Sequence, residues 1–145
     1  DCDCLYGDLV YVDKGDASKI VRYWKSGRFS KKKLRMGWML PHPTFFVKKE
    51  IYEKYGLYNL ELKTAADYEM ILRLLHKDNI KIEYLPEVLV NMRMGGKSNS
   101  SFINRLKGNY EDNLAWDMNN LRKPLLIRFL KPLRKVKQFF KKPKI

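Results

Sequence analysis

Thr64-Ala-Ala-Asp-Tyr-Glu-Met-Ile-Leu-Arg73 is the stretch that most strongly shapes the predicted fold, because it opens a well-defined amphipathic helix. Apolar side chains recur at helical spacing through Leu75, and the pattern ends near residues 77–79. Thr64 is the predicted N-cap, and with Asp67 it has the spacing of a capping box. An acid in the first turn also favours the helix dipole. A structural role would therefore account for Asp67, although a helix start beside a cleft also holds a carboxylate in place.

Two further charged residues of this helix have different expected roles. Glu69 lies two positions after Asp67 and points elsewhere around the helix, so it is the weaker candidate for a catalytic base. Arg73 lies six positions after Asp67 and need not touch it. We expect Arg73 to form a structural salt link.

Strands and other helices are predicted on both sides of this helix. Leu5 to Val12 has the composition of a strand, and Asp8 and Asp13 are candidates to face a cleft at a strand end. The remaining expectations are a short helix or irregular segment over 18–27, a strand over 44–47, a helix over 48–55 capped by Gly56, strands over 81–85 and 88–92 joined at Pro86-Glu87, and a long helix over 102–121 ended by Pro124. This alternation predicts an α/β fold.

Two short motifs have both structural and functional readings. Pro41 and Pro43 push His42 into an extended conformation, where it could line the core or offer a hydrogen bond in a cleft. Neither His42 nor His76 has the ligand spacing of a metal site. The segment 94–99, Met-Gly-Gly-Lys-Ser-Asn, could be an ordinary turn or could approach a phosphate closely, but it lacks the spacing of a P-loop.

Charge is unevenly distributed along the 145 residues, whose formal net charge is +14. Residues 22–35 contain seven Lys or Arg and no acid, and residues 118–145 contain ten and no acid. Two basic zones on a nearly neutral body predict an anionic partner at those places. Cys2 and Cys4 are expected to be reduced thiols, which favours the cytosol.

The C-terminal stretch from Leu125 to Lys142 combines an apolar stripe with a basic face, and Pro132 is expected to kink or split it. Such a pattern predicts a basic amphipathic helix lying in the interface of an anionic membrane. A solvated terminal helix packed on the domain is the alternative. The basic residues expected to face the membrane are Arg128, Lys131, Arg134, Lys135, Lys137, Lys141 and Lys142.

A series of motifs, taken in order, resembles family 2 glycosyltransferases of the bacterial surface-polysaccharide type. The resemblance runs from Leu5 to about Asn99, and its specificity comes from the order of the motifs. These motifs are Tyr6-Gly7-Asp8, Gly-Trp-Met-Leu-Pro-His-Pro-Thr at 37–44, Tyr55-Gly56-Leu57, Ala-Ala-Asp-Tyr-Glu at 65–69, Leu-Pro-Glu-Val-Leu at 85–89, and Gly-Gly-Lys-Ser-Asn at 95–99.

The resemblance implies the C-terminal, acceptor-side part of a GT-A fold that transfers a sugar from a nucleotide-sugar to a hydroxyl acceptor with inversion. It implies that Asp67 is the general base. It also implies that further residues lie on the acceptor side or near the diphosphate, namely His42, Thr44, Glu69, Lys97, Ser98 and Asn99. The expected layout is a glycosyltransferase portion over 1–101, a packing helix over 102–123 and the basic tail over 124–145.

The first half of the family, with its nucleotide-binding strands and Asp-x-Asp metal motif, has no counterpart here. Asp1-Cys2-Asp3 has the motif's letters but not its place, and we interpret it as chance. The expected divalent ion, Mg²⁺ or Mn²⁺, would therefore be held by residues outside this chain. We expect the chain to be the C-terminal part of an enzyme, inactive in isolation, that acts on the inner face of the plasma membrane, where the acceptor could be lipid-linked.

Two other classes of function remain as alternatives. Nucleic-acid binding suits the net charge, since Tyr23, Trp24, Phe29 and Trp38 alternate with basic residues as stacking platforms can. Against it, no known nucleic-acid-binding motif is present, and the longest basic run is joined to an apolar face. A non-catalytic module that binds a membrane or a protein partner is the other alternative.

Overall fold

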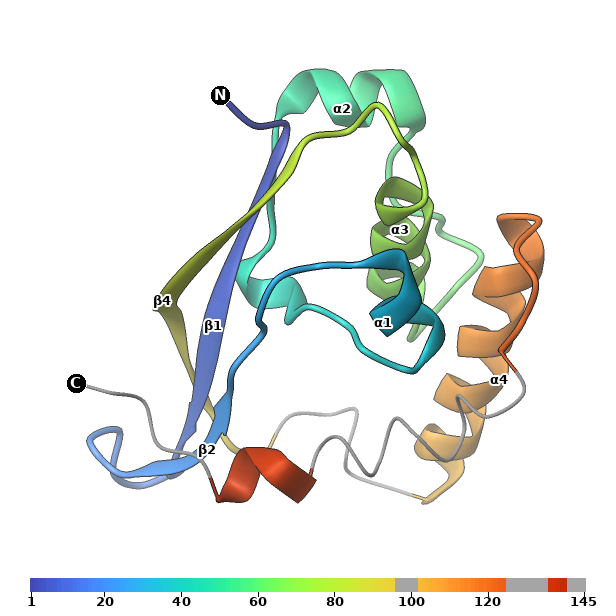
Figure 1. The fold of residues 1–145 in the computed structure, drawn as a ribbon. Coiled ribbons are helices and arrows are strands. Elements are labelled where there is room, and N and C mark those ends of the chain that lie inside the picture. The colour runs from blue at the N-terminus through green and yellow to red at the C-terminus, as the bar shows by residue number, and fades with distance from the viewer. Residues whose placement is uncertain (96–101, 125–135, 141–145) are drawn as a thin grey trace.

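The computed structural model describes residues 1–95, 102–124 and 136–140, and it has a mixed α/β fold, as predicted (Figure 1). A small sheet lies on one side of the molecule and helices lie on the other. The elements in chain order are β1 (Cys4–Val12), β2 (Ile20–Trp24), α1 (Lys31–Arg35), the 3₁₀ turn η1 (His42–Thr44), β3 (Phe46–Val47), α2 (Lys49–Tyr55), α3 (Ala66–Leu75), β4 (Ile82–Arg93), α4 (Phe102–Met118) and the 3₁₀ turn η3 (Lys137–Phe139).

The predicted first strand, β1, is the centre of the sheet. β4 runs parallel to β1 from Cys4 to Val12. The other edge of β1 is shared by two antiparallel strands, β3 beside its start and β2 beside its end. Because β1 has a neighbour on both edges and helices over one face, most of its side chains are buried, which explains its largely apolar composition.

The two strands expected over 81–85 and 88–92 are one strand, β4, so the predicted break at Pro86-Glu87 is wrong. The pairing register with β1 shifts opposite Tyr6 and Asp8, which means that β4 bulges there instead of ending. Proline lacks an N–H, and such a bulge is a place where a strand tolerates it. The bulge crosses directly over Gly7, where an added Cβ would lie 2.5 Å from Leu89 Cγ.

Residues 18–27, expected to be helical or irregular, instead include the strand β2. Its β-branched and aromatic side chains favour a strand once an open edge of β1 is available for pairing. The strand expected over 44–47 is also shorter than predicted. A 3₁₀ turn occupies 42–44, and only Phe46 and Val47 pair with β1.

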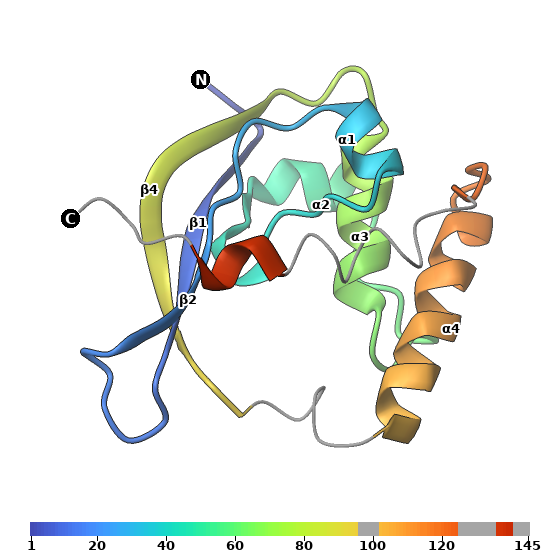
Figure 2. The ribbon, with the colours of Figure 1, turned by 60° about the horizontal axis from the view of Figure 1, so that its bottom comes forward.

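The helix α2 agrees with the predicted one within one residue. α3 ends at Leu75, two to four residues before the predicted end, and α4 ends three residues before its predicted end. Gly56 ends α2 with a φ of +93°, a conformation that favours glycine, as expected of a cap. Figure 2 shows α3 between the sheet and α4. The hydrophobic core joins the sheet, α3 and α4. Its buried side chains include Tyr6, Leu40, Met70, Leu72, Leu75 and Trp116.

The capping box predicted at the start of α3 does not form. The N-cap is Ala65, and its side chain makes no capping bond. A carboxylate from α4 acts instead, because Glu111 Oε2 accepts hydrogen bonds from the backbone N–H groups of Thr64 (2.7 Å) and Ala65 (3.0 Å) and from Thr64 Oγ1 (2.7 Å). Burial opposes the charge of Glu111, but these hydrogen bonds outweigh it and hold its pKa below the ordinary value.

The predicted basic tail falls mostly outside the described residues, which leaves its helical expectation untested. Arg128, Lys131, Arg134, Lys135, Lys141 and Lys142 lie in that part, and Lys137 begins the described turn η3. This turn lies against β2, where Arg22 Nε donates to Gln138 Oε1 at 2.7 Å. Within the described part of the chain, no helix is both long and apolar enough to cross a bilayer.

Candidate functional site

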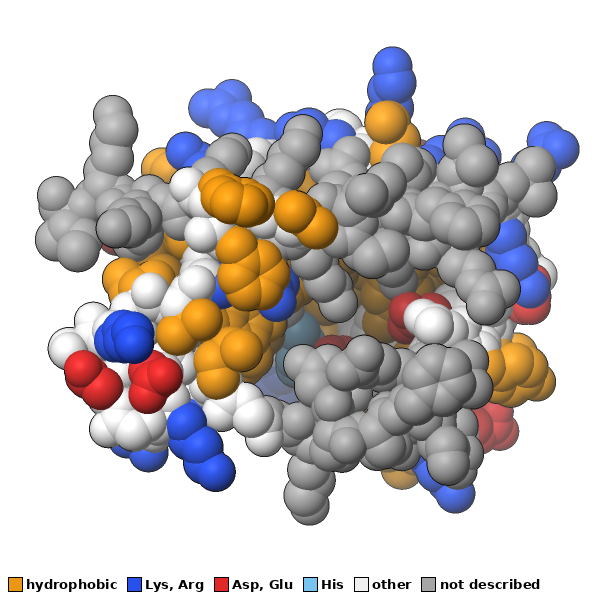
Figure 3. Space-filling model, turned by 90° about the horizontal axis from the view of Figure 1, so that it is seen from below, with side chains coloured by type: hydrophobic (Ala, Val, Ile, Leu, Met, Phe, Trp, Pro, Cys, Tyr) orange, Lys and Arg blue, Asp and Glu red, His pale blue; other side chains and the backbone are white. Residues whose placement is uncertain are grey.

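The candidate site lies at the end of the molecule where β1 and β4 terminate and α3 begins, the bottom of Figure 1. In open α/β sheets, ligands bind beyond the carboxyl ends of the parallel strands. Figure 3 views this end directly and shows a histidine side chain recessed near the middle of the face, with an acidic side chain beside it. The largest group of hydrophobic side chains on this face lies to the left of that recess (Figure 3).

Asp67 lies in the first turn of α3 and keeps 46% of its side chain exposed. Its Oδ1 accepts a hydrogen bond from the Tyr68 N–H at 2.7 Å, which orients the carboxylate. Its Oδ2 faces His42 Nδ1 at 3.9 Å, an ion-pair distance that is too long for a hydrogen bond. Asp67 therefore presents an oriented, solvent-accessible carboxylate with one oxygen available.

His42 begins the turn η1, so the extended conformation predicted for it is wrong. The turn is closed by hydrogen bonds from Thr44 N to the Pro41 carbonyl (3.0 Å) and from Phe45 N to the His42 carbonyl (2.9 Å). Proline is compatible with the first turn of such a helix, and here Pro43 occupies that place. The turn brings the half-exposed His42 ring toward Asp67.

Thr44 has a structural position and does not face the site. It is fully buried, and its Oγ1 lies 3.0 Å from the Gly7 carbonyl and 2.9 Å from the Pro41 carbonyl. These contacts join the turn η1 to the centre of β1. Thr44 thus supports the backbone that carries His42, and it offers no group to a ligand on the acceptor side.

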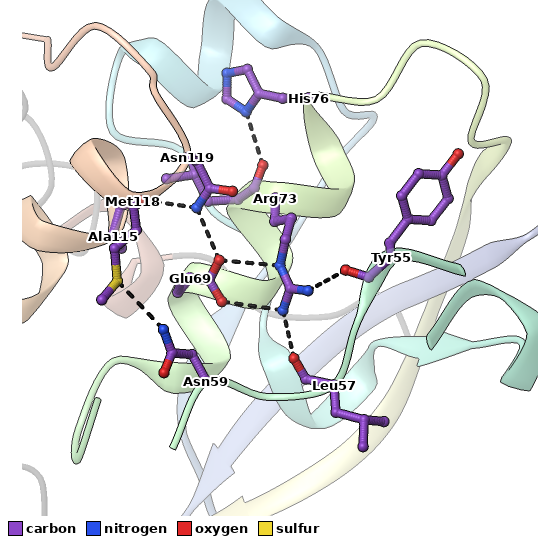
Figure 4. Close-up of polar contacts among 10 residues, drawn as sticks. Tyr55, Leu57, Asn59, Glu69, Arg73, His76, Ala115, Met118 and Asn119 are labelled. Carbon is purple, nitrogen blue, oxygen red and sulfur yellow. Dashed lines mark hydrogen bonds and ion pairs between the residues drawn. The ribbon is translucent and has the colours of Figure 1, made fainter. Parts of the chain in front are cut away.

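Glu69 is also a structural residue, as Figure 4 shows. Only 4% of it is exposed, and Arg73 binds both of its carboxylate oxygens, Oε1 at 3.1 Å and Oε2 at 3.2 Å. Asn119, one residue past the end of α4, donates to Oε1 at 3.0 Å. Arg73 also donates to the backbone carbonyls of Tyr55 and Leu57 (2.7 Å for Leu57), so the expected salt link of Arg73 holds the loop after α2 against α3.

Asp8, a sequence candidate for facing a cleft, is instead buried in the middle of β1 with 1% exposed. Its Oδ1 accepts from Ser26 N at 2.8 Å and from the Tyr84 hydroxyl at 2.7 Å, and its Oδ2 accepts from the Tyr23 hydroxyl. Burial raises the pKa of the Tyr84 hydroxyl to about 12, and the hydrogen bond and charge of Asp8 add to this shift. The same causes raise the pKa of Tyr23. Asp8 therefore ties β1 to β2 and β4.

Asp13, the second such candidate, shapes the turn that follows β1. Its Oδ1 accepts hydrogen bonds from the backbone N–H groups of Gly15 at 2.9 Å and Asp16 at 3.3 Å. This side-chain pattern is typical of an Asx turn. Asp8 and Asp13 thus both have structural partners, which leaves Asp67 as the acid of the site.

Tyr58 is a residue of the site that the sequence did not indicate. It lies in the loop between α2 and α3, and its hydroxyl is 2.9 Å from His42 Nε2. The two rings meet edge to face with centroids 6.0 Å apart. Burial, together with the nearby Tyr52 hydroxyl and Asp67 carboxylate, raises the pKa of Tyr58 to about 12. A single tyrosine in an irregular loop carries no periodic signal, so no pattern could have found it.

The remaining predicted site residues, Lys97, Ser98 and Asn99, lie outside the described residues. Within the part of the chain that is described, no group of three or more His, Cys, Asp or Glu side chains is placed to hold a metal ion. Among the described residues, the site brings together a carboxylate, an imidazole and a phenol.

Comparisons of the chain with protein-family models, with curated proteins and with solved structures found no match.

Proposed function

We propose that this chain is the acceptor-side part of an inverting glycosyltransferase with a GT-A fold, and that Asp67 is its general base. The enzyme would transfer a sugar from a nucleotide-sugar to a hydroxyl acceptor during cell-surface polysaccharide or glycolipid synthesis. The observation that carries the proposal is the state of Asp67, an oriented carboxylate that is nearly half exposed at the start of α3. The ordered series of sequence motifs from Leu5 to Asn99 gives independent support.

The other acids of the motif series support the choice of Asp67 by contrast. Asp8 and Glu69 are buried and have hydrogen-bond donors on both carboxylate oxygens. Because each of these acids is buried, neither can accept a proton from a substrate hydroxyl without losing contacts that stabilise the fold. Asp67 can accept one at Oδ2 while its Oδ1 stays bonded to the Tyr68 N–H.

In the proposed reaction, the acceptor hydroxyl donates its hydrogen bond to Asp67 Oδ2. As the acceptor oxygen forms a bond to the anomeric carbon of the donor sugar, its proton moves to Oδ2. The bond between that carbon and the diphosphate oxygen breaks on the opposite face, and the nucleoside diphosphate leaves with the electron pair. A positioned base accelerates such a step by roughly 10²–10⁴-fold.

The donor and its divalent cation belong, in this proposal, to residues outside the chain. The described residues contain no group of three metal-ligating side chains, so we assign no Mg²⁺ or Mn²⁺ site to them. The part played by this chain is to receive the acceptor and to remove its proton.

The test is a transfer assay on the complete reading frame that encodes this chain. A panel of radiolabelled UDP-, GDP- and dTDP-sugars would be incubated with Mg²⁺ or Mn²⁺ and a lipid extract from the source cells, and labelled lipid would be counted. We expect Asp67→Asn to lower the rate by about 10²–10⁴-fold. Glu53→Gln, which removes an exposed acid paired with Lys49 on α2, is the matched control and should keep the rate. A near-wild-type rate for Asp67→Asn would refute the assignment of the base.

Membrane association is part of the same proposal, and the turn η3 gives it support. Val136, Phe139 and Phe140 are exposed there, with Phe140 at 83%, inside a stretch that has ten basic residues and no acid. Arg22 lies over the Phe139 ring, with 5.6 Å between Cζ and the ring centroid, so the two acid-free basic stretches meet at β2. Exposed aromatic and basic side chains together favour the interface of an anionic bilayer on the cytoplasmic side.

Liposome flotation tests this association. At low salt, the chain should float with vesicles of phosphatidylcholine and phosphatidylglycerol, and it should stay behind with phosphatidylcholine alone. Phe139→Ser combined with Phe140→Ser should weaken flotation, whereas Tyr110→Ser, at an exposed position of α4, should not. Failure of the wild type to float would remove the membrane from the proposal. Tight salt-dependent binding to DNA would then favour the nucleic-acid alternative.

A further inference from the structure

Asp67 belongs to a small polar group that three separate elements bring together. His42 comes from the turn η1, Tyr58 from the loop after α2, and Asp67 from the first turn of α3. The Tyr58 hydroxyl lies 2.9 Å from His42 Nε2, and Asp67 Oδ2 lies 3.9 Å from His42 Nδ1. The imidazole is thus placed between a phenol and a carboxylate, with one ring nitrogen toward each.

This arrangement decides where His42 carries its proton. Neutral imidazole has one N–H and one acceptor nitrogen. A proton on Nε2 would leave the Nδ1 lone pair facing the Asp67 carboxylate, so two acceptors would oppose each other. A proton on Nδ1 points an N–H at the carboxylate, and Nε2 then accepts from the Tyr58 hydroxyl. Imidazolium also has a proton on Nδ1, so the same group faces Asp67 in both charge states.

Tyr58 is suited to be the donor to Nε2. Burial, with the contribution of Tyr52 and Asp67, raises its pKa to about 12, so the phenol keeps its proton at neutral pH. The two rings meet at an interplanar angle of 87°, which brings the hydroxyl to the edge of the imidazole. The hydrogen bond made by one ring nitrogen sets the tautomer at the other.

We infer that His42 is a positioning residue for Asp67, with its neutral ring protonated on Nδ1 and with Tyr58 fixing that tautomer. The N–H of Nδ1 holds Oδ2 in place, while the Tyr68 N–H holds Oδ1. The separation of 3.9 Å shortens to a hydrogen bond when an acceptor excludes water, as catalytic contacts do in ligand complexes. The catalytic value of this arrangement rests on the proposed function. The predicted tautomer of His42 is independent of that function.

The tautomer is measured directly by ¹⁵N NMR of the imidazole nitrogens. The chain has two histidines, and His42→Gln assigns the signals. His76 is an internal reference, because its Nδ1 lies 2.9 Å from the Leu72 carbonyl and must carry a proton to bond it. For the neutral ring, observed at alkaline pH, we expect Nδ1 of His42 to have the chemical shift of a protonated nitrogen and Nε2 that of a hydrogen-bond acceptor.

Variants decide whether Tyr58 sets the tautomer. Tyr58→Phe removes the donor to Nε2, and the His42 signals should move toward the Nε2–H form. Tyr110→Phe, at an exposed position of α4, should leave them unchanged. A His42 protonated on Nε2 in the wild type, or unchanged in Tyr58→Phe, would overturn the inference.

Activity separates this inference from the proposed function. In the complete reading frame, His42→Ala should lower kcat by about 10²-fold, the scale of a misplaced catalytic group. His42→Asn, whose amide nitrogen replaces Nδ1, should restore much of it. If Asp67→Asn is inactive while His42→Ala is not impaired, the positioning role fails and the base assignment stands. If Asp67→Asn is fully active, the proposed function fails, and the NMR result still decides the tautomer.

Discussion

Asp67 and Glu69 are two carboxylates on one helix, separated by two positions, and their surroundings are opposite. Successive residues of an α-helix are about 100° apart, so these two side chains face different directions. Glu69 faces α4 and is buried with Arg73 and Asn119 on its oxygens, whereas Asp67 faces the open end of the sheet with one oxygen bonded. The contrast shows that the bonding state of an acid, and not its place in a motif, separates a structural role from a chemical one.

The largest expected effect on stability comes from the Glu69 side of the contrast. Arg73→Met would leave the Glu69 charge buried without its partner and would remove the donor to the Tyr55 and Leu57 carbonyls. Breaking a buried ion pair in this way costs about 3–5 kcal/mol. Urea unfolding followed by tryptophan fluorescence measures it. Asp67→Asn in the same assay should stay within about 0.5 kcal/mol, and an equal loss for both variants would break the comparison.

Asp8 extends the comparison to a third acid, in the sheet. Asp8→Ala would leave the Ser26 N–H and the hydroxyls of Tyr23 and Tyr84 without their acceptor inside the protein. We expect a loss of about 2–4 kcal/mol, because each lost bond to a charged group costs about 1.5–3 kcal/mol and the tyrosines can partly rearrange. Asp8→Asn, which keeps one acceptor oxygen, should lose less. Equal unfolding midpoints for Asp8→Ala and wild type would contradict the structural assignment.

A smaller effect, with a pH dependence, is expected at Glu111. Its pKa is lowered in the folded state, so its contribution is fully present above the ordinary pKa and disappears as the pH falls through the lowered value. Glu111→Gln should lose about 0.5–2 kcal/mol at pH 7, the value of a helix cap. This difference from wild type should shrink as the unfolding experiments are taken below pH 4. A constant difference across the acid range would show that the charge of Glu111 is not responsible.

The smallest effect is expected at Thr64, whose hydroxyl adds one further bond to the Glu111 carboxylate. Thr64→Val should lower the unfolding free energy by about 0.5–1 kcal/mol. In combination with Glu111→Gln, the loss should be less than the sum, since both variants remove the same contact. Strict additivity would return Thr64 to the independent capping role predicted from the sequence.

Local sequence patterns predicted the secondary structure correctly where it depends only on neighbouring residues. The periodicity of α2 and α3, the apolar run of β1 and the cap at Gly56 all concern contacts within one element or the next residue. The role of Arg73 was also predictable as a salt link, because Glu69 lies four positions before it on the same helix.

Predictions failed where a distant segment decided the structure. β2 and the unbroken β4 depend on the free edges of β1, and the supposed cap residue Thr64 bonds an acid 47 positions away. Tyr58 reaches His42 across 16 positions from a loop without a repeating pattern. No local propensity encodes such partners.

The sequence by itself determined the mixed α/β class, the central strand, the main helices and the candidate acid Asp67. Only the tertiary structure decided which acids are structural, because burial and hydrogen-bond donors from other elements occupy Asp8 and Glu69 and leave Asp67 open. The physical reason is that a hydrophobic pattern specifies which face of an element is buried. The donors that meet a given carboxylate depend on how those faces pack together.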